Sequence, residues 1–232
     1  MTDLTTFSKK IKKDTSKSHS MAENTGFVTN FLAGVVSKES YKQLIADFYF
    51  IYTALEEQVE KYKDDPFIAP IAFDELKRVP ALEKDCEFYW GEHWRSIIYP
   101  TDACKNYVAR VKKINAKFLV GHHYTRYLGD LSGGQILRNI ANKSMNLDGK
   151  GLAFYEFEGI SNPKGFKERY RHALDNLPIT WSDGELIINE ANYAFKLNMD
   201  VFDEIGSSRP FPLLSTMRGL LQLTWRSIKS KK

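Results

Sequence analysis

Residues 118–146 read FLVGHHYTRYLGDLSGGQILRNIANKSMN and are the most informative part of this chain. Their apolar side chains recur at spacings of three and four, which predicts a helix. Gly129, Gly133 and Gly134 fall inside that helix, and each glycine costs roughly 0.8–1 kcal/mol relative to alanine. A helix that carries a penalty of about 2–3 kcal/mol is expected to gain something from it, such as a kink or a backbone open to close approach.

Two interpretations of these glycines stay open on spacing alone. Gly129 and Gly133 are four residues apart and therefore share one face of the helix. That face either packs closely against another helix or brings backbone within van der Waals reach of a flat ligand. A phosphate-binding P-loop is excluded, because no Gly-Lys-Ser/Thr follows the glycines.

The remaining sequence is also helical in its spacing and shows neither a repeat nor the alternation of strands. A loop is predicted over 149–159, with a few extended residues around 154–157. Ser40 and Thr101 are the expected N-caps of the helices that follow them. The sequence predicts one all-α, multi-helix domain over residues 1–206. Its other helices are expected over 4–19, 26–36, 41–63, 81–91, 101–114, 163–176 and 183–205.

Residues 207–232 form a separate, basic amphipathic segment. Docking on the domain, contact with a partner and contact with an anionic membrane all fit it. Arg218, Arg226 and Lys229 lie mostly opposite an apolar stripe. The stripe consists of Leu213, Leu214, Met217, Leu220, Leu221, Thr224, Trp225 and Ile228.

Composition excludes several classes of protein. The chain has 232 residues, of which 43% are hydrophobic and 27% charged, so a disordered or fibrous protein is excluded. Its two cysteines, Cys86 and Cys104, exclude a disulfide scaffold and fit a reducing compartment, the cytoplasm. We expect no signal peptide and no transmembrane anchor. The net charge of +4 is weak evidence for nucleic acid and favours anionic small molecules or an acidic protein partner.

His19 extends the apolar face of the first predicted helix, and Glu23 follows one turn later. A histidine on such a face is either a satisfied core residue or an axial ligand of haem iron that a neighbouring carboxylate orients. Adjacent His122 and His123 face different sides and make a poor metal pair. No Glu-x-x-His pair occurs, which excludes a carboxylate-bridged di-iron bundle. The lysines at 9, 10, 12, 13 and 17, like the pair Lys167 and Arg171, are either solvated or bind carboxylates.

Residues 124–135, YTRYLGDLSGGQ, closely resemble the signature of the haem oxygenase family. Residues 19–24, HSMAEN, resemble the family's proximal-histidine segment, at the expected distance upstream. Further matches extend from Phe7 to Phe202 and include YTALEE at 52–57, GLAFY at 151–155, FK at 166–167 and FKLN at 195–198. The likeness is greatest to the soluble form of cyanobacteria and algae.

The resemblance implies roles for individual residues. His19 is expected to be the axial ligand through Nε2, with Glu23 as its hydrogen-bond partner. Gly129 and Gly133 are expected to lie against the distal face of the haem. Asp130, with Tyr52 and Arg126, is expected to organise a water network there. Candidates for contacts with the haem, and with its propionates in particular, are Lys12, Lys17, Tyr124, Ser132, Lys167 and Arg171, and Phe195 and Phe202 are expected to wall the pocket. The animal enzymes carry a lysine three residues before the ligand, where this chain has Ser16.

The resemblance also implies an activity. Haem b would be both cofactor and substrate, and O₂ would open its ring at the alpha-meso carbon, giving biliverdin IX alpha, carbon monoxide and ferrous iron. Electrons must come from outside, because the chain has no flavin or dinucleotide motif. An acidic ferredoxin is the expected donor, and a bilin reductase is a candidate downstream partner. The alternative is a non-catalytic haem carrier or sensor with the same fold.

Overall fold

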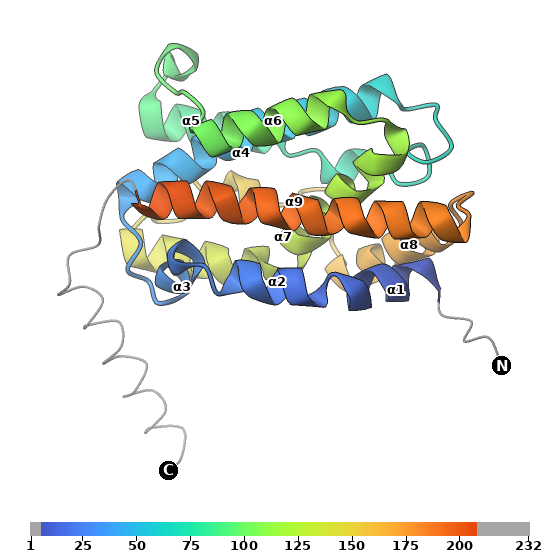
Figure 1. The fold of residues 1–232 in the computed structure, drawn as a ribbon. Helices are drawn as coiled ribbons and strands as arrows, with labels where there is room; N and C mark the ends of the chain where they lie inside the picture. The colour runs from blue at the N-terminus through green and yellow to red at the C-terminus, as the bar shows by residue number, and fades with distance from the viewer. Residues whose placement is uncertain (1–5, 208–232) are drawn as a thin grey trace.

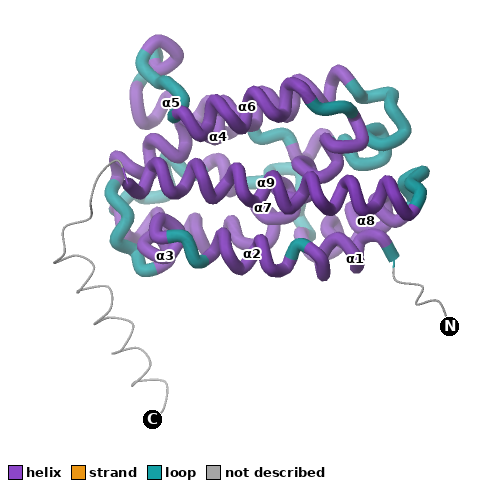
Figure 2. Tube along the Cα trace, in the orientation of Figure 1, coloured by secondary structure: helices purple, strands orange, loops and turns teal. Residues whose placement is uncertain are grey.

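The computed structural model describes residues 6–207, and every regular element in that range is helical (Figures 1 and 2). The α-helices are α1 (Phe7–Asp14), α2 (Ser16–Glu23), α3 (Gly26–Leu32), α4 (Lys38–Lys61), α5 (Val79–Trp90), α6 (Asp102–Lys113), α7 (Ala116–Met145), α8 (Pro163–Asp175) and α9 (Trp181–Ser207). Short 3-10 helices form η1 (Asp74–Leu76), η2 (Trp94–Ser96) and η3 (Ala153–Tyr155). The expected all-α fold is therefore confirmed. The domain boundary at residues 206–207 stays a prediction, because the segment that follows it, with the apolar stripe at 213–228, lies outside the described residues.

Helix α9 crosses the middle of the molecule, with α4 and α6 on one side and α1, α2 and α3 on the other (Figure 1). Helix α9 packs most extensively against α7. Gly121 of α7 permits that contact, because a Cβ there would lie 2.8 Å from the backbone nitrogen of Ala191 and 2.9 Å from the carbonyl oxygen of Ile187. Close packing of helices is thus the role of a glycine that the sequence pattern did not single out.

Several predicted boundaries are wrong in detail. The first predicted helix is two helices, α1 and α2, which meet at the buried Thr15, whose Oγ1 donates to the carbonyl of Ile11 at 2.7 Å. Helix α4 is capped by Ser37, which accepts from the amide of Ser40, so Ser40 itself is not the N-cap. Thr101 does cap α6, as predicted.

The extended residues expected near 154–157 instead begin with the short helix η3. Buried Asp85 of α5 accepts hydrogen bonds from the amides of Ala153 and Phe154, both at 2.8 Å. This carboxylate holds the segment in a tight turn, an arrangement that depends on a residue almost 70 positions away. In the described part of the chain, none of the helices is long and apolar enough to cross a membrane.

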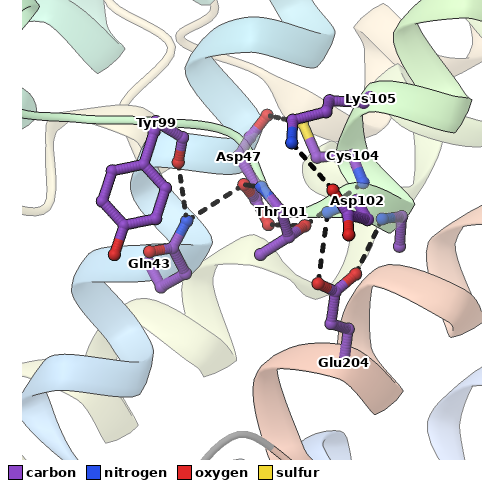
Figure 3. Close-up of polar contacts among 9 residues, drawn as sticks. Gln43, Asp47, Tyr99, Thr101, Asp102, Cys104, Lys105 and Glu204 are labelled. Carbon is purple, nitrogen blue, oxygen red and sulfur yellow. Dashed lines mark hydrogen bonds and ion pairs between the residues drawn. The ribbon is translucent and has the colours of Figure 1, made fainter.

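Polar side chains fix the start of α6 to α4 and α9 (Figure 3). Buried Asp47 of α4 accepts from the amide of Thr101 at 3.0 Å and from its hydroxyl at 2.7 Å, and from Gln43 at 3.2 Å. Glu204 of α9 accepts from the first amides of α6, those of Asp102 and Ala103. A carboxylate at a helix N-terminus satisfies otherwise free amides and complements the helix dipole.

Replacing Asp47 by Asn is expected to change how stability depends on pH. Burial raises the pKa of Asp47 to about 6, although hydrogen bonds from Thr101 and Gln43 oppose the shift. The folded state therefore holds this proton more tightly than the unfolded chain, and the carboxylate costs stability as pH rises from about 4 to about 6. Asn cannot lose a proton. From pH 4 to pH 7, the stability of Asp47→Asn relative to the parent chain should rise by about 2–3 kcal/mol.

Urea unfolding of both chains at each pH measures this difference. The exposed Asp64, changed to Asn in the same way, is the control for the loss of one surface carboxylate. Parallel curves for Asp47→Asn and the parent chain would contradict the prediction.

Candidate functional site

The segments around His19 and Gly133, far apart in sequence, line one cavity. Helices α2 and α3 contribute to it, with α4, α7, η3 and α9. Its open space is about 930 Å³, counting the part that opens to solvent. The walls are strongly aromatic. The phenylalanines that line it are Phe27, Phe31, Phe48, Phe154, Phe195 and Phe202.

His19 stands on α2 at the edge of this cavity. Its side chain is 53% exposed, so it is not a satisfied core histidine. Its Nδ1 lies 3.4 Å from Oε2 of Glu23, one helical turn away. The ring packs edge-on against Phe195 of α9, with 5.8 Å between ring centroids. The carboxylate contact at Nδ1 leaves Nε2 as the ring nitrogen for a ligand.

Gly129 and Gly133 leave one side of α7 bare. A Cβ built on either glycine would meet no atom within 4 Å, and both residues line the cavity. Close helix packing therefore does not explain them. Gly134 differs, because its Cβ would lie 3.3 Å from the ring of Tyr155. Helix α7 is continuous from Ala116 to Met145, through all three glycines.

A buried polar cluster adjoins the bare side of α7. Tyr52 of α4 donates a hydrogen bond to Oδ2 of Asp130. Arg126 donates to the Tyr52 hydroxyl from Nε at 3.0 Å and to Oδ1 of Asn198 from Nη1 at 2.6 Å. Nη2 of Arg126 is buried and lies 3.9 Å from Oδ1 of Asp130. It has no hydrogen-bond partner among the described residues. Arg126 and Asp130 line the cavity, and Tyr52 lies behind them.

Burial is the main influence on the pKa values of Asp130 and Tyr52 in this cluster. Burial raises the pKa of Asp130 above its usual range, and the positive charge of Arg126 opposes that shift. Burial also raises the pKa of Tyr52 well above its usual value, which keeps its hydroxyl protonated as a donor. A carboxyl whose pKa moves toward neutrality is suited to hold and release a proton.

The candidate propionate residues lie outside the cavity lining. Lys12 and Lys17 are exposed on α1 and α2. Helix α8 brings its cations next to α7, where Nζ of Lys167 lies 3.4 Å from the hydroxyl of Ser132. Burial raises the pKa of the half-buried Tyr124, and a hydrogen bond with Thr15 and the charge of Arg171 on α8 oppose that shift. Of these candidates, Ser132 and Lys167 are thus brought together from two helices.

The adjacent histidines of α7 have structural partners. Nε2 of buried His122 lies 2.8 Å from Glu190, and Nδ1 of buried His123 lies 2.7 Å from the Tyr170 hydroxyl. Burial lowers the pKa of His123 to about 3, so this imidazole is neutral at physiological pH. Within residues 6–207 no group of three or more His, Cys, Asp or Glu is placed to hold a metal ion.

Asn198 and four of the phenylalanines that line the cavity were not predicted from the sequence. Asn198 accepts the hydrogen bond that orients Arg126. The spacing of Phe195, Asn198 and Phe202 puts these three residues on one face of α9. Because both phenylalanines were predicted to line the pocket, this spacing could have identified Asn198 as well. The missed walls come from three different segments and had no local signal. They are Phe27, Phe31, Phe48 and Phe154.

Comparisons with known proteins point to one family. A family model described as heme oxygenase matches residues 5–204. The chain is 48% identical over 202 residues to heme oxygenase of Rhodella violacea, which covers 85% of this chain and 86% of that protein. It is 50% identical over 200 residues to heme oxygenase 1 of Nostoc sp., covering 84% of each chain.

A solved structure is equally similar. The crystal structure of heme oxygenase-1 from the cyanobacterium Synechocystis sp., in complex with heme, matches with a TM-score of 0.85 and 44% identity, covering 97% of this chain and all of that one. The family match over most of the chain and the identities near 50% establish the relationship. This chain therefore belongs to the haem oxygenase family, and its relatives include those of cyanobacteria and red algae.

Proposed function

We propose that this protein binds haem b in the cavity between α2 and α7 and cleaves it with O₂ at the alpha-meso carbon. The products would be biliverdin IX alpha, carbon monoxide and ferrous iron. One observation carries the proposal: a half-exposed imidazole and a helix face without side chains line the same aromatic-walled cavity. Such a site suits a planar macrocycle that carries iron, because the imidazole could bind the metal and the bare helix face would leave room for the ring. The complex of the Synechocystis relative with heme supports this assignment.

Each half of the site would then have its own task. The bound haem supplies the iron at which O₂ is activated. His19 would hold the iron through Nε2, while Glu23 at Nδ1 fixes the ring and its tautomer. Gly129 and Gly133 would let the backbone of α7 lie against the other face of the ring.

The polar cluster would handle protons. Asp130 would hold and return protons through ordered water, with Tyr52 and Arg126 fixing its carboxylate. The free Nη2 of Arg126 is a buried donor beside the cavity, available to the same water. Asn198 would keep Arg126 in place.

An acidic protein would deliver the electrons, and we propose a ferredoxin. Residues 1–207 are not basic as a whole. Six of the 33 Lys and Arg and none of the 29 Asp and Glu lie in residues 208–232, so residues 1–207 carry a net charge of −2. The positive surface is local. Helices α1 and α8 are joined where Asp175 accepts from the amide and hydroxyl of Ser8.

Both helices, with α2, carry cations that make no ion pair within the described residues, and these would steer an acidic donor to the cavity. These cations are Lys9, Lys12, Lys13, Lys17, Lys164, Lys167 and Arg171. Lys12, Lys17, Lys167 and Arg171 are also our candidates for contacts with the haem propionates, with Tyr124 and Ser132. Phe195 and Phe202 would wall the ring. The free, buried cysteines fit the cytoplasm, and a bilin reductase would receive the product.

The test is an anaerobic titration with haem, followed by turnover in air with reduced ferredoxin. We expect saturable binding at one haem per chain. We then expect loss of the haem absorbance and release of a pigment that chromatography identifies as biliverdin IX alpha. A haem complex that stays intact under reductant and O₂ would instead identify a carrier or sensor.

Substitutions at two glycines of α7 should separate ligand space from helix packing. A Cβ at Gly133 would meet no atom within 4 Å, and the residue lines the open cavity. Leucine is also a better helix former than glycine, so the free Gly133→Leu protein should fold with no loss of stability. The same side chain occupies the proposed haem space, and we expect haem affinity to fall by about a hundredfold or more. Thermal unfolding and haem titration measure the two effects.

Gly121→Ala is the matched control on the same helix. Its Cβ meets backbone of α9 at 2.8 and 2.9 Å, which neither helix can relieve without moving. We expect Gly121→Ala to lose about 1–3 kcal/mol of stability. The folded Gly121→Ala protein should bind haem with nearly the affinity of the parent chain. A Gly133→Leu protein that binds haem normally would refute the proposed position of the ring.

A further inference from the structure

The wall that η3 contributes to the cavity is held in place by side chains from outside the cavity. The amide of Phe154 donates to Oδ2 of Asp85 at 2.8 Å, and its carbonyl accepts from Nη1 of Arg78 at 3.2 Å. Asp85 also accepts from the amide of Ala153 at 2.8 Å, and Arg78 also donates to the carbonyl of Glu156 at 2.6 Å. Both polar groups of the Phe154 backbone are thus fixed by side chains of α5 and its N-cap.

Helix α5 holds the same segment at a second point. Tyr89 donates to the carbonyl of Gly151 at 3.0 Å. Gly151 has a φ of +68°, which side chains rarely adopt, and a Cβ there would clash with the ring of Phe88. The backbone from Gly151 to Phe154 therefore follows one face of α5 closely and cannot shift without breaking several of these hydrogen bonds.

Phe154 connects this anchored backbone with the cavity and with the polar cluster. Its ring is buried and lines the cavity. It packs edge-on against Tyr52, with 5.5 Å between ring centroids, and lies 5.1 Å from the ring of Phe48. Tyr52 donates to Asp130, and the guanidinium of Arg126 lies 4.3 Å from the ring of Phe48. A shift of Phe154 would therefore move the cavity wall together with the groups that orient Asp130.

Both anchors are charged side chains that the fold buries. Asp85 is 1% exposed and Arg78 is 4% exposed. Within residues 6–207, the hydrogen bonds of both side chains go to backbone groups. Burial of a charge without an ion pair costs free energy. Apolar side chains could fill this space without that cost, but they would leave the backbone of η3 free to shift.

We propose that Asp85 and Arg78 are positioning residues of the haem site, and that Phe154, which they hold, determines which meso carbon is cleaved. This inference rests on the proposed function. A porphyrin has four meso carbons at its edge, and groups that bind its two faces do not distinguish them. The choice depends on the walls that meet the edge of the ring. Phe154 combines such a wall with an anchored backbone and a contact to Tyr52.

Asp85→Asn is the variant that tests the anchor. Asparagine has nearly the same size, but only its oxygen can accept, so one of the two amides of η3 loses its partner. Asp47→Asn is the matched control, because Asp47 is equally buried, accepts from the amide of Thr101 and lies outside the cavity lining. Arg78 is less suitable. Burial raises the pKa of Asp130 and the charge of Arg78 is one of those that oppose this shift, so its loss would have two effects.

Three measurements are made on each chain. In free Asp85→Asn, the amide of Phe154 should exchange with solvent at least about tenfold faster than in the parent. Haem titration should show about fivefold weaker binding. Turnover should release a second biliverdin isomer in roughly one molecule in ten, whereas the parent releases one isomer. Phe154→Leu shortens the wall without touching the backbone bonds and should give the same mixture. Asp47→Asn should match the parent in all three measurements.

A single isomer and the parent affinity in both Asp85→Asn and Phe154→Leu would overturn the proposal. Equal changes in Asp47→Asn would also overturn it, because they would show a general effect of losing a buried carboxylate. If Asp85→Asn does not fold, the isomers from Phe154→Leu decide. Failure of the proposed function looks different, since the parent chain itself would then release no biliverdin.

Discussion

His19→Ala is expected to lose at least about 99% of biliverdin formation and the spectral signature of an axial nitrogen, while the free protein folds as before. Its side chain is half exposed, so removing it leaves no buried cavity. His19 is also the only histidine among the cavity residues in the described part of the chain. No other imidazole there can replace it as a neutral ligand for ferric or ferrous iron.

Ferric absorption and electron paramagnetic resonance spectra, with biliverdin yield, measure this result. Added imidazole should enter the space left by the side chain and restore the nitrogen signature, which a merely structural role for His19 would not predict. Glu23→Gln is the companion variant. It keeps a hydrogen-bond acceptor for Nδ1 and removes the charge, so we expect a loss of about tenfold. An unchanged ferric spectrum in His19→Ala would remove His19 from the site.

The helices themselves were predictable because their patterns are local. The spacing over residues 118–146 predicted a helix that the structure places at Ala116–Met145. The break at Thr15 was not predictable in this way, because the apolar spacing continues across it from Ile11 to His19. A buried hydroxyl that bonds back to the preceding turn ends α1, and burial is decided by the rest of the fold.

The roles of the glycines in α7 could not be predicted from local sequence patterns. Spacing gave Gly129 and Gly133 two equal interpretations, and only the position of neighbouring helices separates them. The same reasoning overlooked Gly121, whose need for glycine comes entirely from the backbone of α9 some 66–70 residues later. Contacts of this range are invisible to periodicity.

The polar cluster was recognisable only through family resemblance. Tyr52 and Asp130 are 78 residues apart, and Arg126 and Asn198 are 72 apart. No spacing rule connects such pairs. Asn198 was overlooked because an asparagine in the middle of a long helix resembles an ordinary polar position until its partner, here Arg126, is known. These hydrogen bonds matter for stability because the whole cluster is buried, and an unpaired charge there would cost free energy.

Asp130→Ala is expected to bind haem normally and to form biliverdin about a hundredfold more slowly, within the range for loss of a positioned proton-transfer group. The carboxylate accepts from Tyr52 and lies 3.9 Å from Nη2 of Arg126, so it joins both groups to the cavity. Its removal leaves Arg126 without the nearby negative charge. Haem titration should give the parent affinity, because the ligand side of the cavity is untouched.

Two companion variants separate proton transfer from positioning. Asp130→Asn keeps the shape and the acceptor for Tyr52 but cannot take up a proton, so a proton-transfer role predicts a rate as low as that of the alanine variant. Tyr52→Phe removes the fixed donor and leaves the carboxylate, so the rate should fall less. Because burial raises the pKa of Asp130 and the hydrogen bond from Tyr52 opposes that shift, loss of this bond should move the acidic limb of the pH–rate profile toward higher pH. A normal yield of biliverdin from Asp130→Asn would show that the carboxylate positions Arg126 and transfers no proton.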